Sequence, residues 1–273
     1  MPHPSSPAHA PRPTSPSTLR TRSRPTARTY WAATWATLCC TLPLAVLAAP
    51  PQCLAISGAS LTPVIELYTS EGCSSCPPAD QWLSGLKGQP VVAQAFHVAY
   101  WDYIGWKDRF AQPVFSARQR DIAAQNRQSG IYTPQLVRNG HDWSDWHRQR
   151  GSLLAAGAQQ PAKARISLQR VGETDAFEAR VEPLDAQTSW TAYWTVTEDG
   201  HSSRVKTGEN AGEYLKHDFV VRQYTPVGQY QGPQVLKFFA LAQQPEHQRR
   251  INIVVQDAQR KEPLQALSLA CTS

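Results

Sequence analysis

The sequence lacks the paired ligand patterns of a zinc-binding module. Cys73 and Cys76 form one Cys-X-X-Cys motif, but no second motif of this kind follows, and no two histidines are close neighbours. A structural zinc site needs two further ligands, and His97 and Cys271 would have to come from distant parts of the chain. We therefore expect no metal site, and a copper or zinc carrier with the dithiol as soft ligands is a weaker third option. The chain also has no fixed-period repeat and no N-glycosylation sequon.

Acidic residues are absent from residues 1–49, which carry five arginines. The basic stretch is followed by an apolar run at residues 30–49, and residues 46–48 supply a small-residue cleavage pattern. This order indicates a secretory signal, so we expect residues 1–49, called the leader below, to be a signal peptide of a periplasmic or secreted protein. The apolar run is also long enough for an uncleaved membrane anchor.

Positive charge is concentrated in the leader. The whole chain has a formal net charge of +6, and removal of the five leader arginines reduces this charge to +1. So small a charge gives no support for a basic nucleic-acid-binding surface. We expect no nucleic-acid partner, and no membrane association unless the leader stays uncleaved.

Two of the six cysteines lie in the leader. The remaining four are Cys53, Cys73, Cys76 and Cys271. Four cysteines in an exported chain suit an oxidising compartment. Cys53 and Cys271 are near the ends of the expected mature chain, so they could form a structural bridge if the ends meet; two unpaired thiols are the alternative.

The Cys73–Cys76 motif follows an apolar, β-branched run at residues 64–69 and precedes a helix-like run at residues 81–86. A helix N-terminus offers unpaired N–H groups and positive partial charge, which favour a thiolate. The second cysteine is close enough to attack a mixed disulfide made by the first, and the small ring should be readily reduced. We predict dithiol–disulfide chemistry, with Cys73 as the more exposed attacking thiolate and Cys76 as the resolving thiol. Electrons then pass through the dithiol itself, so no cofactor is implied.

The chain beyond the motif alternates between strand and helix patterns as far as residue 158. We expect a strand at residues 90–98, an aromatic-rich loop at 100–110, a helix from Pro113 and another at 144–158. Asn139-Gly140 is a strong hairpin signal. After Pro161 short runs of alternating polarity indicate an antiparallel β domain. These runs begin at residues 164, 177, 190, 217, 235 and 251.

Several segments together resemble domain of unknown function 1223, an exported family placed in the thioredoxin-like superfamily. They are residues 64–80, 97–108, 132–135, 208–212, 217–222 and 255–257. The resemblance spans residues 61–273 and implies a thioredoxin-like fold, in which a cis-proline faces the dithiol and leaves room for an extended partner chain. Thr133 and Pro134 occupy that position here; the alternative is an ordinary trans proline that opens an edge strand. Ala99 stands where the family is expected to have Asp, so no role for that carboxylate is carried over.

Charged residues around the motif have simple local explanations. Glu71 is expected to be a solvated loop charge, and Asp80 to complement the dipole of the following helix. Glu66, within an apolar strand, suits either an edge position or a buried acid. His217 is expected to make a hydrogen bond at a domain interface.

These observations predict a fold and a function. The expected fold class is an α/β thioredoxin-like domain at residues 63–158, preceded by a linker at 50–62 and followed by an antiparallel β-sandwich-like domain at 162–273. The expected function is exchange with protein or small-molecule thiols and disulfides, as a possible thiol-disulfide oxidoreductase. Thr133, Pro134 and Trp101, the last within the aromatic loop, would bind the partner. The alternative is a non-catalytic binding protein whose Cys73–Cys76 disulfide is structural.

Overall fold

The structure is a computed structural model that describes residues 53–148 and 160–271. These described residues belong to one compact unit. The predicted leader lies outside the described residues, as do most of the helix predicted at residues 144–158 and the boundary predicted after residue 158. In the part of the chain that the structure describes, no helix is long and apolar enough to cross a membrane.

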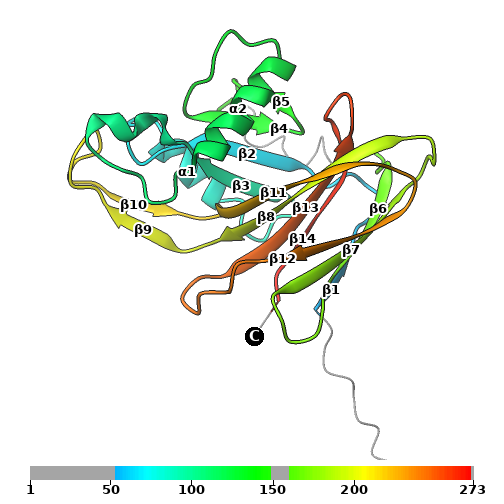
Figure 1. The fold of residues 1–273 in the computed structure, drawn as a ribbon. Coiled ribbons are helices and arrows are strands. Elements are labelled where there is room, and N and C mark those ends of the chain that lie inside the picture. Colours follow the sequence, from blue (N-terminus) through cyan, green and yellow to red (C-terminus); the bar gives the residue numbers. More distant parts are fainter. Residues whose placement is uncertain (1–52, 149–159, 272–273) are drawn as a thin grey trace, which may run out of the picture. The chain divides into compact units, whose positions relative to one another are not determined.

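Eight strands form one continuous sheet (Figure 1). In chain order they are β2 (Val64–Thr69), β3 (Val92–His97), β4 (Gln135–Arg138), β5 (His141–Asp142), β8 (Ser189–Glu198), β11 (Val220–Gln231), β13 (Arg249–Asp257) and β14 (Pro263–Leu269). Across the sheet their order is β14-β13-β8-β11-β3-β2-β4-β5. Strand β11 joins the two halves, because it pairs antiparallel with β8 and, where Val220 faces Ala95, parallel with β3.

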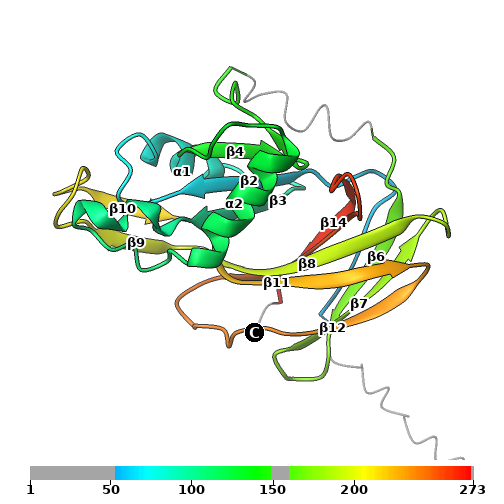
Figure 2. The ribbon, with the colours of Figure 1, turned by 45° about the horizontal axis from the view of Figure 1, so that its top comes forward.

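Helices cover both faces of the β3-β2-β4 part of this sheet (Figure 2). They are α1 (Pro77–Ser84), the 3-10 helix η1 (Ala99–Ile104) and α2 (Pro113–Gln125). Alternate residues of β2 point to opposite faces, so Leu67 packs with Leu83 of α1, while Tyr68 packs with Phe115 of α2. Every residue of β2 is buried.

Glu66 is the one charged residue of β2, and it is a buried acid rather than an exposed edge residue. Arg118 of α2 donates to both of its carboxylate oxygens, at 2.6 and 3.0 Å, and the hydroxyls of Tyr68 and Tyr193 donate to it as well. Burial raises the pKa of Glu66, but the Arg118 charge and these hydrogen bonds outweigh it and lower the pKa below its usual value. This ion pair ties α2 to the sheet.

A second sheet packs on the β8, β13 and β14 half of the large one. It consists of β1 (Leu54–Ile56), β6 (Ala164–Arg170), β7 (Ala176–Pro183) and β12 (Gln234–Phe239), in the order β1-β6-β7-β12. Inward-facing side chains fill the space between the sheets, and Trp194 stacks on Phe238 with ring centroids 5.0 Å apart. Cys53 and Cys271 pack against this core and form a disulfide, called the terminal disulfide below.

Strands β9 (His201–Arg204) and β10 (Tyr214–His217) form a separate two-stranded sheet. In Figures 1 and 2 it lies beside α1, at the same end of the large sheet as the start of that helix. His217, the last residue of β10, therefore comes close to residues of the Cys73–Cys76 region.

The predicted fold class, an α/β thioredoxin-like domain followed by an antiparallel β-sandwich-like domain, is wrong. Strands hold 43% of the structure and helices 13%, and the described residues contain three helices, so they show no α/β thioredoxin-like core. The physical reason lies at β3. Without a neighbour on that side, the edge of β3 would carry unpaired backbone N–H and C=O groups. Strand β11, which follows much later in the chain, pairs with β3 there and continues the sheet. Periodicity shows which residues alternate, but not which strands become neighbours.

Several local predictions are confirmed. Residues 64–69 are a strand, a helix begins at Pro113, and Asn139-Gly140 turns between β4 and β5 with φ values of 50° and 83°. These positive values are why an Asn-Gly pair suits this turn. Residues 54–56, in the segment expected to be a linker, form strand β1 and pair with β6.

Candidate functional site

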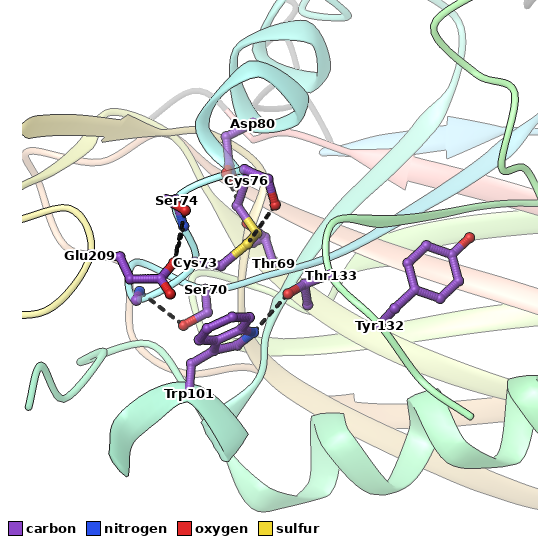
Figure 3. Close-up of a disulfide and its surroundings, with 12 residues drawn as sticks. Thr69, Ser70, Cys73, Ser74, Cys76, Asp80, Trp101, Tyr132, Thr133 and Glu209 are labelled. Carbon is purple, nitrogen blue, oxygen red and sulfur yellow. Dashed lines mark hydrogen bonds between the residues drawn. A yellow bond between two sulfur atoms is a disulfide. The ribbon is translucent and has the colours of Figure 1, made fainter. Parts of the chain in front are cut away.

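Cys73 and Cys76 are joined in a disulfide at the start of α1, called the short disulfide below (Figure 3). Cys76 is the N-cap residue, and Pro77 and Pro78 open the helix, where a missing N–H costs no intrahelical bond. The carbonyl of Cys76 accepts from the N–H groups of Ala79 and Asp80. The motif thus lies where the strand β2 gives way to a helix N-terminus, as predicted.

Thr133, Pro134 and Trp101 all lie beside this loop. Gln135 pairs with Tyr68, which places Pro134 next to the end of β2, and the Thr133-Pro134 peptide bond is cis. The indole N–H of Trp101 donates to the Thr133 hydroxyl at 2.7 Å (Figure 3). Trp101 also packs against Gly72, where an added Cβ would lie 3.1 Å from the Trp101 Cβ. The structure therefore brings the five predicted site residues into one region.

Both cysteines are fully buried, with 0% of each exposed. The expectation that Cys73 is the more exposed of the two is therefore wrong. Residues 208–212, called the 208–212 segment below, hold the loop that carries Cys73. Glu209 accepts hydrogen bonds from the N–H and hydroxyl of Ser74, at 3.2 and 2.8 Å. Asn210 donates to the carbonyls of Glu71 and Cys73, at 2.8 and 3.0 Å.

Glu71 is buried, so its assignment as a solvated loop charge is wrong. Trp106 donates to its Oε2 atom at 2.7 Å, and His217 Nε2 lies 3.3 Å from its Oε1 atom. Burial raises the pKa of Glu71, but its contacts with His217, Ser203 and Trp106 outweigh burial and lower the pKa below its usual value. The carboxylate is thus paired within the protein instead of facing solvent.

Asp80 is also buried. A carboxylate that only complements the helix dipole does not need to be buried, so the predicted role does not explain this position. Its Oδ2 atom accepts from the Thr69 hydroxyl at 2.8 Å, and its Oδ1 atom lies 3.7 Å from His217 Nδ1. Burial lowers the pKa of His217, but Asp80 and Glu71, one on each side of its ring, overcome this and raise the pKa to about 10. His97, at the end of β3, completes the group, with its Nδ1 atom 2.7 Å from Asp108 Oδ2.

Sequence reasoning missed these residues as a group because their partners are remote in the chain. His217 follows Glu71 by 146 positions and Asp80 by 137 positions. A useful signal was present, however: His97 and His217 both stand at ends of segments with strand patterns, and the motif itself follows the end of another strand. His217 nevertheless lies in a different sheet from His97, so this signal alone does not bring the two histidines together.

One family model and two solved structures match this chain. The sequence profile of a family described as "Protein of unknown function (DUF1223)" matches residues 64–256, which include all five predicted site residues. Protein AGR_C_4864 from Agrobacterium tumefaciens has a solved structure with a TM-score of 0.63 and 25% sequence identity, covering 78% of this chain and 96% of that one. HBP35 of Porphyromonas gingivalis is similar in fold, with a TM-score of 0.56, 12% identity, and coverage of 77% of this chain and 75% of that one. No curated protein matches the chain.

Proposed function

The chain belongs to the DUF1223 family of unknown function, and we propose that its short disulfide is a reversible redox centre that exchanges with thiols and disulfides of partner molecules. The observation that carries this proposal is the position of the disulfide. Cys76 is the N-cap residue of α1, and the disulfide lies beside Thr133, Pro134 and Trp101. A helix N-terminus stabilises the thiolate that exchange requires.

The reaction begins with the reduced pair. The Cys73 thiolate attacks one sulfur of a partner disulfide, forms a mixed disulfide, and releases the other partner sulfur as a thiolate. Cys76, as a thiolate, then attacks the Cys73 sulfur, which forms the short disulfide and releases the second partner thiolate. Two electrons pass from the protein to the partner, and the reverse sequence oxidises a partner dithiol. The reduction potentials of the two couples set the direction.

Thr133, Pro134 and Trp101 are proposed to bind the partner. Pro134 has no N–H group, and the backbone before it lies beside the end of β2, from which the disulfide loop departs. Trp101 provides an aromatic wall whose orientation is held by Thr133. Because both cysteines are buried, the partner reaches Cys73 only after the 208–212 segment moves away from the loop.

Export of the protein is part of the same proposal. Disulfides persist in oxidising compartments and are rare in the cytosol, and the structure has two of them. The leader pattern supports the same assignment. A periplasmic or secreted location would supply partners whose own thiols are being oxidised or rearranged.

Replacement of Cys73 tests the assignment. The reduced protein would be mixed with oxidised glutathione, and the appearance of reduced glutathione would be followed. Cys73→Ser should abolish formation of the short disulfide and slow the release of reduced glutathione, because Cys76 alone can form only a mixed disulfide. A control variant with serine at both Cys53 and Cys271 should retain both, because that change leaves Cys73 and Cys76 in place. Equal exchange by the Cys73→Ser variant and the wild type would remove Cys73 from the mechanism.

The alternative is a non-catalytic binding protein in which the short disulfide is structural. The complete burial of both cysteines favours this alternative. Under this alternative, a reductant would reach the disulfide only when the whole protein unfolds. Its reduction rate would then follow the global unfolding rate, which urea dependence measures.

A further inference from the structure

Three side chains that can bind a metal ion lie close together at the first turn of α1. Asp80 comes from the first turn of α1, His97 from the end of β3 and His217 from the end of β10. One potential ligand atom from each lies within 4.8 Å of the others. All three residues are buried, with 7%, 0% and 2% exposed respectively. We call these three residues the buried triad.

Each member of the buried triad is oriented by a further polar group. Asp108 Oδ2 lies 2.7 Å from His97 Nδ1 and also accepts from a backbone N–H, so it orients the His97 ring with Nδ1 as the donor; in the neutral ring Nε2 then carries the lone pair. Glu71 lies 3.3 Å from His217 Nε2, which leaves Nδ1 of that ring facing Asp80. Thr69 donates to one oxygen of Asp80 and leaves the other free for a ligand. Such outer partners are typical of histidine and carboxylate ligands in metal sites.

Buried ring nitrogens without hydrogen-bond partners favour a metal site over a simple ion pair at the buried triad. The carboxylates of Glu71 and Asp80 require a positive charge near His217, which either a proton or a metal ion can supply. A proton on His217 balances the charge of those two carboxylates, but both nitrogens of His217 and the buried Nε2 atom of His97 remain without a hydrogen-bond partner. A cation between the three side chains would satisfy His97 Nε2, His217 Nδ1 and Asp80 Oδ1 together.

We propose that the buried triad binds a Zn²⁺ ion through His97 Nε2, His217 Nδ1 and Asp80 Oδ1. Two imidazoles and one carboxylate suit zinc, with water as a fourth ligand, and argue against Mg²⁺ or Ca²⁺, which prefer oxygen ligands. Zinc bonds to such ligands are about 2.0–2.2 Å long, so the side chains must move closer than they now are. This departs from the sequence-based expectation of no metal site, because the ligands come from three separate elements.

A cavity between α1 and β10 lies beside two members of the buried triad. A cavity of about 440 Å³ is lined by Asp80 and His217, together with Pro77, Ser84, Tyr214 and Asp218. The proposed ion would therefore be reached from this cavity, without opening the core of the sheet. The inference does not depend on redox turnover of the short disulfide, because neither cysteine is a ligand.

Calorimetric titration with ZnCl₂ tests the site. The chain without its leader, freed of metal with a chelator and checked for the absence of free thiols, should bind one Zn²⁺ per chain. Keeping the disulfides oxidised prevents a thiolate from acting as a ligand. Co²⁺ titration, followed by visible absorption, reports the ligand geometry independently. Circular dichroism of each variant confirms that it is folded.

Three variants separate ligand, orienting and neighbouring residues. Asp108→Asn should weaken zinc binding by about 10- to 100-fold, as loss of an outer partner does, and Asp80→Asn should weaken it further. Asp218→Asn is the matched control, because it removes a carboxylate of the same cavity that is not a ligand, and it should bind zinc as the wild type does. The proposal is overturned if the wild type binds no stoichiometric zinc, if Asp80→Asn binds as tightly as the wild type, or if Asp218→Asn weakens binding as much as Asp80→Asn.

Discussion

Replacement of Asn210 by alanine should make the short disulfide easier to reduce. The Asn210 side chain donates to the carbonyls of Glu71 and Cys73, and these bonds hold the 208–212 segment against the loop that carries Cys73. Because both cysteines are buried, we expect a reductant to reach them only when this segment opens. The variant removes both bonds from the closed state and leaves the cysteines themselves unchanged.

The size of the effect follows from the two hydrogen bonds. Each bond contributes about 0.5–1.5 kcal/mol to the closed state, so their loss should favour opening by about 1–3 kcal/mol. A tenfold change corresponds to about 1.4 kcal/mol, which gives a rise of about 5- to 150-fold in the open population. When opening and closing are faster than the reduction itself, the reduction rate rises by the same factor.

The assay is the rate at which a phosphine reductant produces free thiols at Cys73 and Cys76, which are alkylated and located by mass spectrometry. Asn126→Ala is the matched control. Asn126 also donates to two backbone carbonyls, those of Ile122 and Gly140, both at 2.9 Å, but it lies at the end of α2. That variant should reduce at the wild-type rate.

Two results would refute this reasoning. If Asn210→Ala is reduced no faster than the wild type, the 208–212 segment does not control access to the short disulfide. If Asn126→Ala accelerates reduction as much as Asn210→Ala does, then general loss of stability, and not local opening, exposes the cysteines.

Three other predictions concern stability and partner binding. Glu66→Gln should lower the free energy of unfolding at pH 7 by about 3–5 kcal/mol, because it leaves Arg118 without its buried partner. Since the pKa of Glu66 is lowered on folding, this stabilisation is present above its unfolded pKa and is lost as the pH falls through the folded value. Urea unfolding of the variant and the wild type checks this, and a difference in unfolding free energy that stays constant down to pH 3 would contradict it. Replacement of both Cys53 and Cys271 by serine should lower the free energy of unfolding in urea by about 5 kcal/mol, because the terminal disulfide closes a loop with a sequence separation of 218. The same change at Cys73 and Cys76 should lower it by only about 2 kcal/mol. Equal losses in the two variants would argue that loop length does not determine the stabilisation. Trp101→Phe removes the bond to Thr133 and should raise the KM for a disulfide peptide while leaving alkylation of the reduced thiols unchanged; slower alkylation would place Trp101 in the chemistry instead.

Local structure could be predicted from the sequence where neighbours along the chain determine it. The strand before Cys73, the prolines that open α1 and the Asn139-Gly140 turn depend on backbone preferences of a few adjacent residues, and each was predicted. The joining of β11 to β3 was not predictable in this way, because it is a pairing between residues 125 positions apart, Val220 and Ala95.

The charged residues show the same division. Glu71 and Asp80 were given local roles, a loop charge and a helix-dipole charge, because the positions next to them suggested nothing else. In the folded chain both lie beside His217, on the two sides of its ring. A carboxylate becomes buried only when a distant partner satisfies it, and such a partner leaves no mark in the neighbouring sequence.

The reduction potential of the short disulfide tests the central claim most directly. The folded protein would be equilibrated with glutathione buffers of graded ratio, and the fraction of Cys73 and Cys76 in the thiol form would be measured by alkylation and mass spectrometry. A reversible redox centre predicts a potential between about −120 and −270 mV, the range of known dithiol exchange proteins. A potential below about −300 mV, typical of structural disulfides, would contradict the proposed exchange and favour the non-catalytic alternative.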